Sequence, residues 1–558
     1  MLYLRDVVLV FIALPVAACI AGCSGGESNP GADAGGDADT DTDTDTDADA
    51  DTDTDTDSDT DTDTDTDTDT DSDSDSAADG EWNLELDVES IYDNVEFLAS
   101  NICAGRWPLG VGMDAAQNHI EGIWESAELE PVGDDGTFRQ HLPYDDYIQE
   151  SARLVWGGEE LDDGVDYTVG RYSGPAEVAG EAVFVGFGIR IPPFDPVQYS
   201  ECPYPAEGYD DFAGIEMDGK VALTLFGYPG GDAALFEKCP AFEDYSSKIS
   251  YLKANGGLAI VGTMDYSQPA HALYGVTQQP ESFDLEIPLI VVDREYFERD
   301  IPDLADRYVK VGQKYTSASI ATGIEISVRL EARVEKAEIS NLLGVIRGTD
   351  PVLKDEVVVI GSHIDHMGVH PSTGEVYPGA NDNASGLAVI TEIARAMSAS
   401  DRKPARTVVF AAWNAEEAGL FGSCYYTKHP PFPLESTVAM ISPDQLGDSD
   451  GAGVGVYVSG GGDALSGWLP ELMSASAEQR DLEYVAFHIP QTGRSDHACF
   501  VENGVPGTAV VVMGNHETYH TSLDTADNVD LPALESSAAM IWALLAPLAL
   551  GTEDQYLD

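Results

Sequence analysis

Basic residues are scarce in this sequence of 558 residues: 27 lysines and arginines stand against 101 aspartates and glutamates, a formal net charge of −74. Twenty-two of the acidic residues lie between Asp33 and Asp79, where no basic residue offsets them. Residues 80–558 still hold 26 basic and 77 acidic side chains, a net charge of −51. A surface of this sign repels nucleic acid and anionic membranes. Nucleic acid is therefore excluded as a partner.

Cysteine is also sparse. Beyond the first 23 residues the number of cysteines is odd, and no two of them form a C-x-x-C pair. Neither a disulfide scaffold nor a thiolate zinc finger is therefore indicated. The only pairing that the sequence suggests is Cys202 with Cys239. The cysteines concerned are Cys103, Cys202, Cys239, Cys424 and Cys499.

The N-terminal apolar run is too short to cross a bilayer. Val7–Ile20 has about 14 residues, where a spanning helix needs ~20. Arg5 precedes the run, and Ile20-Ala21-Gly22-Cys23 resembles the lipobox of bacterial lipoprotein signal peptides. We expect residues 1–23 to be a removable export signal and Cys23 to carry the lipid, which anchors the protein in a bacterial cell envelope, at the outer membrane or cell surface. The alternative is an ordinary secretory signal, and either one takes the protein out of the cytoplasm.

Residues 24–80 lack sizeable apolar side chains. From Asp37 to Ser76 the sequence is almost pure alternation of Asp with Thr, Ala or Ser. Such a segment cannot bury a core and repels itself, which predicts a disordered, extended tether. At ~3.3 Å per residue it reaches on the order of 190 Å. The alternating aspartates are similar to the start of an EF-hand loop, but the glycine and closing glutamate of such loops are missing, so specific calcium binding is not expected.

The remaining chain is too long for a single typical core, and we expect two globular units. Residues 81–150 contain apolar residues at helical spacing, at 88–99 and 113–128, and are assigned to the N-terminal part of the first unit. Residues 151–325 change to strand-like runs with Gly and Pro between them, and one helix is expected at 245–255. This stretch resembles a protease-associated domain, a small β-rich module inserted into several exopeptidases. The strands expected in it are 181–189, 220–226 and 287–292.

Residues 326–558 alternate between strands and helices. This alternation predicts an α/β fold with a mixed, largely parallel central sheet and helices on both faces. The last helix is expected to end before Pro547. The strands are expected at 357–360, 407–413, 438–441, 454–458, 485–489 and 508–513, and the helices at 387–397, 420–427, 464–478 and 534–545.

Five potential metal ligands lie in this last region. In open α/β sheets, ligands bind outside the carboxyl ends of the strands, and all the candidates but Asp382 follow shortly after a strand-like run. Neutral imidazoles and carboxylates are the ligands that zinc prefers where water and substrate must enter. Five of them suffice for two ions if one carboxylate bridges. The candidates are His363, Asp382, Glu417, Asp444 and His520.

Two further acidic residues adjoin the candidate ligands. Asp365 comes two residues after His363 and is expected to hold that imidazole in its metal-binding tautomer. Glu416 lies directly before Glu417, which makes it a candidate general base for a metal-activated water.

Five blocks of this sequence resemble the successive motifs of the co-catalytic di-zinc aminopeptidase family, metallopeptidase family twenty-eight. The family also contains glutamate carboxypeptidases, glutaminyl cyclases and the transferrin receptor. The resemblance covers about residues 85–150 and 330–550, in the family's order. The blocks are Gly361-Ser362-His363-Ile364-Asp365, Gly379 to Gly386, Ala415 to Ser423, Ser495-Asp496-His497 and Tyr519-His520-Thr521.

The resemblance implies a zinc exopeptidase fold and assigns roles. Asp382 bridges two zinc ions, His363 and Asp444 complete one site, and Glu417 and His520 complete the other. Glu416 is then the general base, Tyr519 donates to the tetrahedral oxyanion, and Arg494 lines the substrate pocket. One block departs from the family, because Ser442-Pro443-Asp444-Gln445 stands where an Asn-Leu-Asp-Met type sequence is common, and Asp444 is the assignment that this departure affects.

Two other motifs suggest different enzymes. His516-Glu517-Thr518-Tyr519-His520 is a literal H-E-x-x-H, which in zincins needs a helix, but no helical pattern surrounds it here. Gly447 to Gly451 matches the nucleophile-elbow string, yet it leads into glycines and a strand instead of a helix. Both alternatives are disfavoured on that context.

We expect a metallo-aminopeptidase acting on peptide substrates, with membrane attachment only through lipid on Cys23. A carboxypeptidase or glutaminyl cyclase of the same family, and a receptor-like protein that only binds partners, are the alternatives. The β-rich insertion is expected to shade the crevice and restrict access to short peptides or free chain ends.

Overall fold

The structure is a computed structural model in which one compact unit comprises residues 83–558. The signal peptide with Cys23, the Asp-rich tether, Arg494, and His516-Glu517 all lie outside the described residues. The structure describes residues 82–171, 173–200, 202, 204–226, 251–264, 287–301, 304, 319–448, 455–482, 485–489, 495–512, 514 and 518–557.

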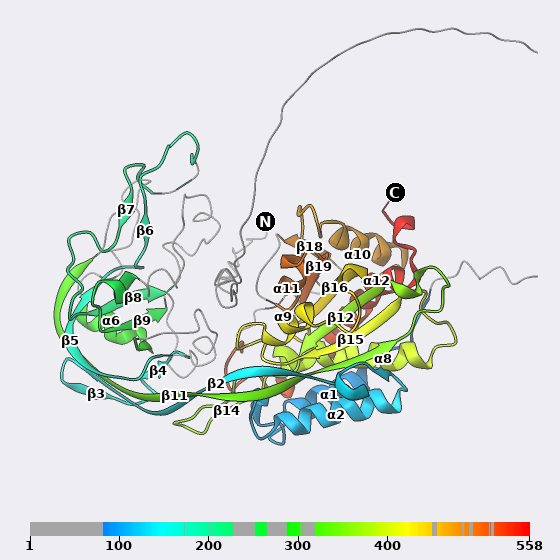
Figure 1. The fold of residues 1–558 in the computed structure, drawn as a ribbon, viewed down its shortest axis with the longest axis horizontal. Helices are drawn as coiled ribbons and strands as arrows, with labels where there is room; N and C mark the ends of the chain where they lie inside the picture. Colours follow the sequence, from blue (N-terminus) through cyan, green and yellow to red (C-terminus); the bar gives the residue numbers. More distant parts are fainter. Residues whose placement is uncertain are drawn as a thin grey trace, which may run out of the picture. The chain divides into compact units, whose positions relative to one another are not determined.

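The last third of the chain folds on four neighbouring parallel strands (Figure 1). Their spatial order is β15, β12, β16, β19, and every neighbouring pair is parallel. Beyond β19 the sheet continues through antiparallel β17 to β18, and beyond β15 through antiparallel β11. The expected largely parallel α/β sheet is confirmed. The bounds are β12 (Val357–His363), β15 (Thr407–Trp413), β16 (Thr437–Asp444), β17 (Gly455–Ser459), β18 (Val485–Ile489) and β19 (Gly507–Val512).

Helices cover both faces of this sheet. Val357 and Val359 of β12 share a buried cluster with Tyr426 of α9 and Phe500 of α11. Successive side chains of a strand point to opposite faces, so buried Val358 faces the other side, where α8 contacts β12, β15 and β16. The helices are α1 (Val88–Leu98), α2 (Met113–Ser126), α8 (Gly386–Ala399), α9 (Phe421–Lys428), α10 (Trp468–Gln479), α11 (His497–Glu502) and α12 (Leu531–Leu550).

Helix α12 corrects one expectation. It does not stop before Pro547 but runs through it to Leu550 and closes on Gly551 at φ 68°. Proline in a helix forfeits one hydrogen bond, and here this happens in the last turn of a helix whose residues 540–549 are all buried. The helix is long and apolar enough to cross a membrane, but 78% of that stretch is buried inside the protein, as in the core helix of a globular fold.

Two long antiparallel strands run through the expected boundaries of the insertion. β2 (Arg139–Trp156) pairs with β11 (Ile320–Ile346), so residues 150/151 and 325/326 lie within continuous strands. The segment between them is β-rich, and β5 begins five residues before the run expected at 181–189. Its main elements are β3 (Glu159–Leu161), β4 (Tyr167–Val169), β5 (Ala176–Phe184), β8 (Val221–Phe226), β9 (Ala259–Met264), β10 (Leu289–Val292) and α6 (Arg294–Asp300). Residues 245–250 of the expected helix lie outside the described part, and the likeness to a protease-associated domain stays a prediction.

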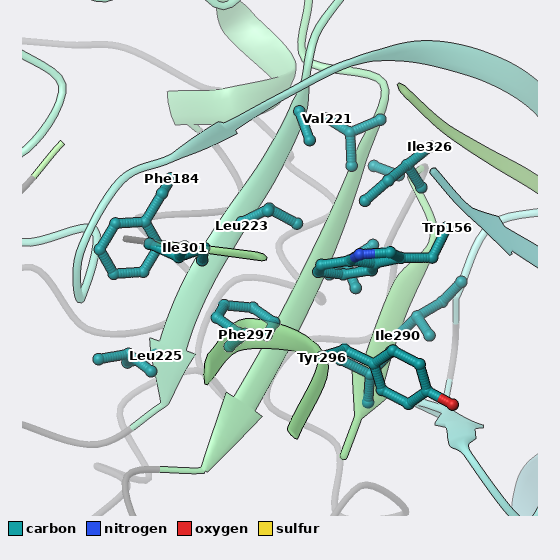
Figure 2. Packing of buried hydrophobic residues seen from close by; sticks show 14 of the residues in the cluster. Trp156, Phe184, Val221, Leu223, Leu225, Ile290, Tyr296, Phe297, Ile301 and Ile326 are labelled. Atoms are coloured by element: carbon teal, nitrogen blue, oxygen red, sulfur yellow. The ribbon is translucent and has the colours of Figure 1, made fainter. Parts of the chain in front are cut away.

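The β-rich part has a hydrophobic core of its own (Figure 2). Trp156 of β2, Phe184 of β5 and Phe297 of α6 are each no more than 1% exposed. The Trp156 and Phe297 ring centroids lie 5.6 Å apart, and Ile326 of β11 belongs to the same cluster. Strands β2 and β11, at the two ends of the insertion, thus pack with helix α6 in one core.

The disulfide expectation was incomplete. Cys424 of α9 and Cys499 of α11 are bonded, with Cα atoms 5.0 Å apart, although 75 residues separate them in sequence. Cys202 is also in a disulfide, whose partner lies outside the described residues, and Cys103 is free. Sequence spacing gave no sign of the Cys424–Cys499 pair because it depends on how α9 packs against α11.

Candidate metal centre

The order of the parallel strands places the candidate residues at a topological switch point. Along the sequence β12 comes first. The next strand, β15, lies on one side of it in the sheet, and the strand after that, β16, lies on the other side. His363 is the last residue of β12, Asp444 is the last residue of β16, and Glu416-Glu417 follow β15 closely. Diverging connections leave a crevice at the carboxyl ends of such strands. The sheet therefore brings these side chains to one place.

Asp382 reaches the same crevice from the loop that precedes α8. The carboxylate of buried Asp524 fixes this loop by accepting hydrogen bonds from the backbone N–H groups of Asn381 (2.8 Å) and Asp382 (3.0 Å). Gly379 begins the turn at φ 65°, and a Cβ there would lie 2.4 Å from the carbonyl oxygen of Asp382. The loop thus requires glycine at this position.

The side chains form two adjoining groups that share Asp382. In one, Nε2 of His363 lies 3.3 Å from Oδ1 of Asp382 and 3.6 Å from Oδ1 of Asp444. In the other, Nε2 of His520 lies 3.0 Å from Oδ2 of Asp382 and 3.1 Å from Oε2 of Glu417. The structure therefore brings all five expected residues together, with one oxygen of Asp382 facing each group.

These spacings fit metal ions. Two ligand atoms bound at about 2.0–2.2 Å to one tetrahedral zinc lie about 3.3–3.6 Å apart. The first group has these separations, and the 3.0 and 3.1 Å of the second group are slightly shorter. Moreover, Oδ1 of Asp444 and Nε2 of His520 are buried without a properly aligned hydrogen bond, which a native fold rarely tolerates. The donor set is carboxylate and imidazole, as zinc prefers at sites that keep an open position.

The electrostatics of the crevice are those of crowded, buried charges. Burial works against a charged His520, but Glu417 and Asp382 raise its pKa to about 10. Burial also opposes ionisation of Glu417, yet the positive charge of His520 at 3.1 Å and the hydrogen bond from His366 lower its pKa to about 2. Such displaced pKa values are typical of functional sites.

Glu416 lies at the edge of the first group. Its carboxylate is buried, and Oε2 lies 4.0 Å from Nε2 of His363. Burial, together with the negative charges of Glu417, Asp496 and Asp444, raises the pKa of Glu416 well above its usual range. Two bound cations would lower the pKa of Glu416. Glu416 is thus placed to exchange protons with a molecule in the crevice.

Asp365 acts differently from the expectation. Its carboxylate lies 4.0 Å from Nδ1 of His363, too far for a hydrogen bond, and Nδ1 instead contacts the backbone oxygen of Asp365 at 3.1 Å. The carboxylate accepts hydrogen bonds from the backbone N–H groups of Glu416 (3.0 Å) and Glu417 (3.2 Å). Asp365 therefore orients His363 through its main chain and the glutamate loop through its side chain. Burial raises the pKa of Asp365 to about 6.

The sequence interpretation missed His366. Its Nδ1 lies 2.9 Å from Oε1 of Glu417 in a buried hydrogen bond, which leaves the other carboxylate oxygen facing His520. Hydrogen bonds of this kind orient metal ligands. The signal available was a second histidine directly after Asp365, but only the fold shows where it points.

Asp496, from the Ser-Asp-His block, was given no role in the sequence interpretation. It is fully buried near the crevice, and burial raises its pKa to about 7. Its block also supplies Ser495, whose hydroxyl contacts that of Ser442 at 3.0 Å.

Pro443 does not disturb Asp444. Strand β16 continues through both residues, which pair with Val510 and Val511 of β19. The carbonyl of Pro443 accepts hydrogen bonds from Ser362 (2.8 Å) and Asn383 (3.0 Å). The departure from the family motif is therefore accommodated inside the sheet.

The two alternative motifs find no support in the described residues. Residues 518–520 form a turn with His520 at φ 55°, not the helix that an H-E-x-x-H site needs. Tyr519 stacks on His520 with ring centroids 3.7 Å apart, which places it beside the ligands. The next described element after Gly447-Asp448 is strand β17, not the helix of a nucleophile elbow.

Comparison with known proteins agrees with this geometry. Residues 341–545 match the model of peptidase family M28. Aminopeptidase YwaD of Bacillus subtilis is 24% identical over 392 residues, which cover 67% of this chain and 80% of that protein. A probable leucine aminopeptidase 2 of Aspergillus oryzae is 26% identical over 65% of this chain and 62% of that protein.

A solved structure shows the same fold. BSAP, a zinc aminopeptidase from Bacillus subtilis, superposes with a TM-score of 0.58 at 18% identity and covers 84% of this chain and 97% of its own. All five candidate ligands and Glu416 lie within the stretch that matches the family model. The region of residues 341–545 thus matches peptidase family M28 in sequence.

Proposed function

We propose that this protein is a zinc-dependent aminopeptidase that removes N-terminal residues from peptides. The observation that carries the proposal is the pair of ligand groups that meet at Asp382, with Glu416 beside them. The activities printed for relatives of the family, an aminopeptidase and a probable leucine aminopeptidase, support it.

Two zinc ions are the implied cofactor. His363 and Asp444 would hold one and Glu417 and His520 the other, with one oxygen of Asp382 on each. A zinc pair supplies a bound water of lowered pKa and a Lewis acid for the peptide carbonyl. The protein's own part is to fix the ligands through Asp365, His366 and Asp524.

Glu416 is proposed as the general base. It takes the proton of the attacking water and delivers it to the departing amine, which requires a carboxylate in the crevice but outside the ligand set. Tyr519, next to His520, is proposed to donate to the developing oxyanion, and Arg494 to line the substrate pocket.

The decisive variant is Glu416→Gln. It keeps the size and hydrogen-bonding shape but cannot accept the proton, so hydrolysis should fall by about 10²–10⁴-fold while zinc content, measured by elemental analysis, stays at two ions per chain. Glu517→Gln is the matched control and should leave activity unchanged. If Glu517→Gln lost activity while Glu416→Gln remained fully active, the H-E-x-x-H motif would instead be the active site.

A panel of peptides decides between members of the family. Peptides with a free N-terminus should be trimmed from that end and N-terminally blocked ones should resist, as followed by mass spectrometry. Release of C-terminal residues would instead indicate a carboxypeptidase, and loss of ammonia from N-terminal glutamine a glutaminyl cyclase. Purification without stoichiometric zinc and without turnover would indicate a receptor-like protein.

A further inference from the structure

Arg106 is a fully buried cation, 0% exposed, that contacts the backbone of the segments carrying His363 and Asp382. A guanidinium has five N–H donors in a rigid planar fork. Here the five donors have five backbone carbonyl oxygens to bond. The bonds run from Nε to Ile364 (2.8 Å), from Nη1 to Leu98 (2.7 Å) and Pro378 (2.6 Å), and from Nη2 to Gly379 (2.7 Å) and Asp382 (3.5 Å).

Four of these carbonyls belong to the two segments that carry the proposed metal ligands His363 and Asp382. Ile364 directly follows His363 at the end of β12. Pro378, Gly379 and Asp382 itself lie in the loop before α8. One side chain therefore ties the segment of His363 to the segment of Asp382, and both to the end of α1 through Leu98.

The backbone around Arg106 is held in a costly conformation. Ala104, Gly105 and Arg106 have φ values of 44°, 70° and 52° in succession, a region that residues with a Cβ rarely adopt. A Cβ on Gly105 would lie 2.4 Å from the carbonyl oxygen of Gly368, so this turn is packed tightly against β13 (Gly368–Val369). The carbonyl of Arg106 accepts a hydrogen bond from the backbone N–H of His366 at 3.1 Å. Strain of this kind persists only where the surroundings enforce it, and it gathers at functional sites.

The charge of Arg106 is balanced by the site above it. Burying a cation is costly unless it is hydrogen-bonded and paired. Here the attraction of Asp524, Asp382 and Asp365 offsets part of that cost. Asp524 accepts hydrogen bonds from backbone N–H groups of the Asp382 loop, while Arg106 donates to carbonyls of the same loop. That loop is thus held through both its N–H and its C=O groups.

We propose that Arg106 is a positioning residue that holds His363 and Asp382 at the separation that the metal pair requires. The inference rests on the proposed function, since it concerns the same centre. Lysine is a poor substitute because an ammonium has three donors on a flexible stem and cannot bond five carbonyls at once.

The test compares Arg106→Met and Arg106→Lys with Arg406→Met. Arg406 is also buried, but it pairs with Glu356 (2.7 Å) and Glu553 (2.8 Å) and bonds the carbonyl of Leu548, in contacts that include none of the proposed ligands. Zinc affinity is measured by competition with a chromogenic chelator, and the fold of the metal-free protein by circular dichroism and thermal melting. Arg106→Met should bind zinc about 10–100-fold more weakly, as losses of outer contacts to metal ligands do, and Arg106→Lys should fall in between. Excess zinc should restore part of the activity of both variants.

Arg406→Met should lower the melting temperature and leave zinc affinity unchanged. Folded Arg106→Met with wild-type zinc affinity would overturn the inference alone. If that variant does not fold, Arg106→Lys decides, and failure of both to fold would assign Arg106 to folding alone and overturn the inference as well. Wild-type protein that binds no zinc would overturn the proposed function, and this inference with it.

Discussion

The peptidase sheet and the β-rich segment bury similar kinds of apolar side chains, but only the peptidase sheet, among the described residues, gathers many buried charges in one cluster. Around β12, β15 and β16 the protein buries carboxylates, imidazoles and a guanidinium completely. In the β-rich segment most charged residues pair at the surface, as Arg153 does with Glu160 at 2.6 Å, and two of the described ones, Arg171 and Asp211, are buried. Among the described residues, groups able to hold a metal occur in the peptidase sheet only.

This difference shows in which region the protein accepts a lower free energy of unfolding in order to build a functional site. Buried charges cost free energy unless partners compensate them, and exposed ion pairs contribute little. In the peptidase sheet, Asp365, Asp524 and Arg106 provide partners for the ligand loops. In the β-rich segment the buried charges are fewer and are met by polar groups: Arg171 donates to the hydroxyl of Tyr144, and Asp211 accepts from the backbone N–H of Ile189 (2.9 Å). Damage to the two regions should therefore have different consequences.

The largest expected effect separates the two cores. Phe297 in the β-rich core and Phe500 in the peptidase core are both 0% exposed. Each change to alanine should cost about 3–5 kcal/mol of unfolding free energy through the cavity it leaves, measured by urea denaturation. Phe297→Ala should leave zinc affinity unchanged, whereas Phe500→Ala, beside bonded Cys499, should weaken it. Equal loss of zinc affinity in both variants would break the comparison.

The disulfide should have the next largest effect, and it lies on the peptidase side only. Cys424 follows the Glu416-Glu417 loop and Cys499 follows Asp496, so their bond links the helices α9 and α11 that come after these two segments. Replacing both by serine releases a loop of 75 residues in the unfolded chain, which should cost about 2–4 kcal/mol. The loss is measured as a decrease in the free energy of unfolding. Cys103→Ser is the control, because that cysteine is free and its replacement opens no loop; an equal loss there would point to packing instead.

The smallest effect concerns a surface charge of the β-rich segment. Hydrogen bonds from Arg299 and then from Nε1 of Trp156 lower the pKa of Asp300, against the opposing effect of partial burial. A carboxyl whose folded pKa is lowered stabilises the fold above its unfolded pKa of 3.8 and loses that contribution as pH falls through the folded value. The contribution should be no more than ~1 kcal/mol, because the pair is partly exposed to solvent, which screens it. Asp300→Asn should flatten the pH dependence of unfolding free energy in the acid range, and an unchanged slope would contradict the assignment.

Much of the fold could be predicted because the pattern of apolar residues follows the burial of each element. The run at 407–413 is β15 residue for residue, and 485–489 is β18. The predicted boundaries of elements were wrong where tertiary packing outweighed the local conformational preference of the residues. Pro547 stays inside α12, whose residues 540–549 are all buried. The edges of the insertion fall within β2 and β11 because those strands pair with each other over most of their length.

The candidate ligands were predictable because their residue types and order are local properties. His366, Arg106 and the Cys424–Cys499 bond were not. Each depends on where a side chain points after distant segments meet: His366 on Glu417, Arg106 on the carbonyls of two loops, and Cys424 on the packing of α9 against α11.

The sequence by itself determined which residues have the chemistry for a metal centre and which segments form the parallel strands, since both follow from side-chain type and periodicity. Only the tertiary structure decided that Asp382 faces both groups, that Asp365 fixes the glutamate loop and that a buried arginine lies beneath them. Those facts are distances between segments far apart in the chain, and they exist only once the sheet has brought the ends of its strands together.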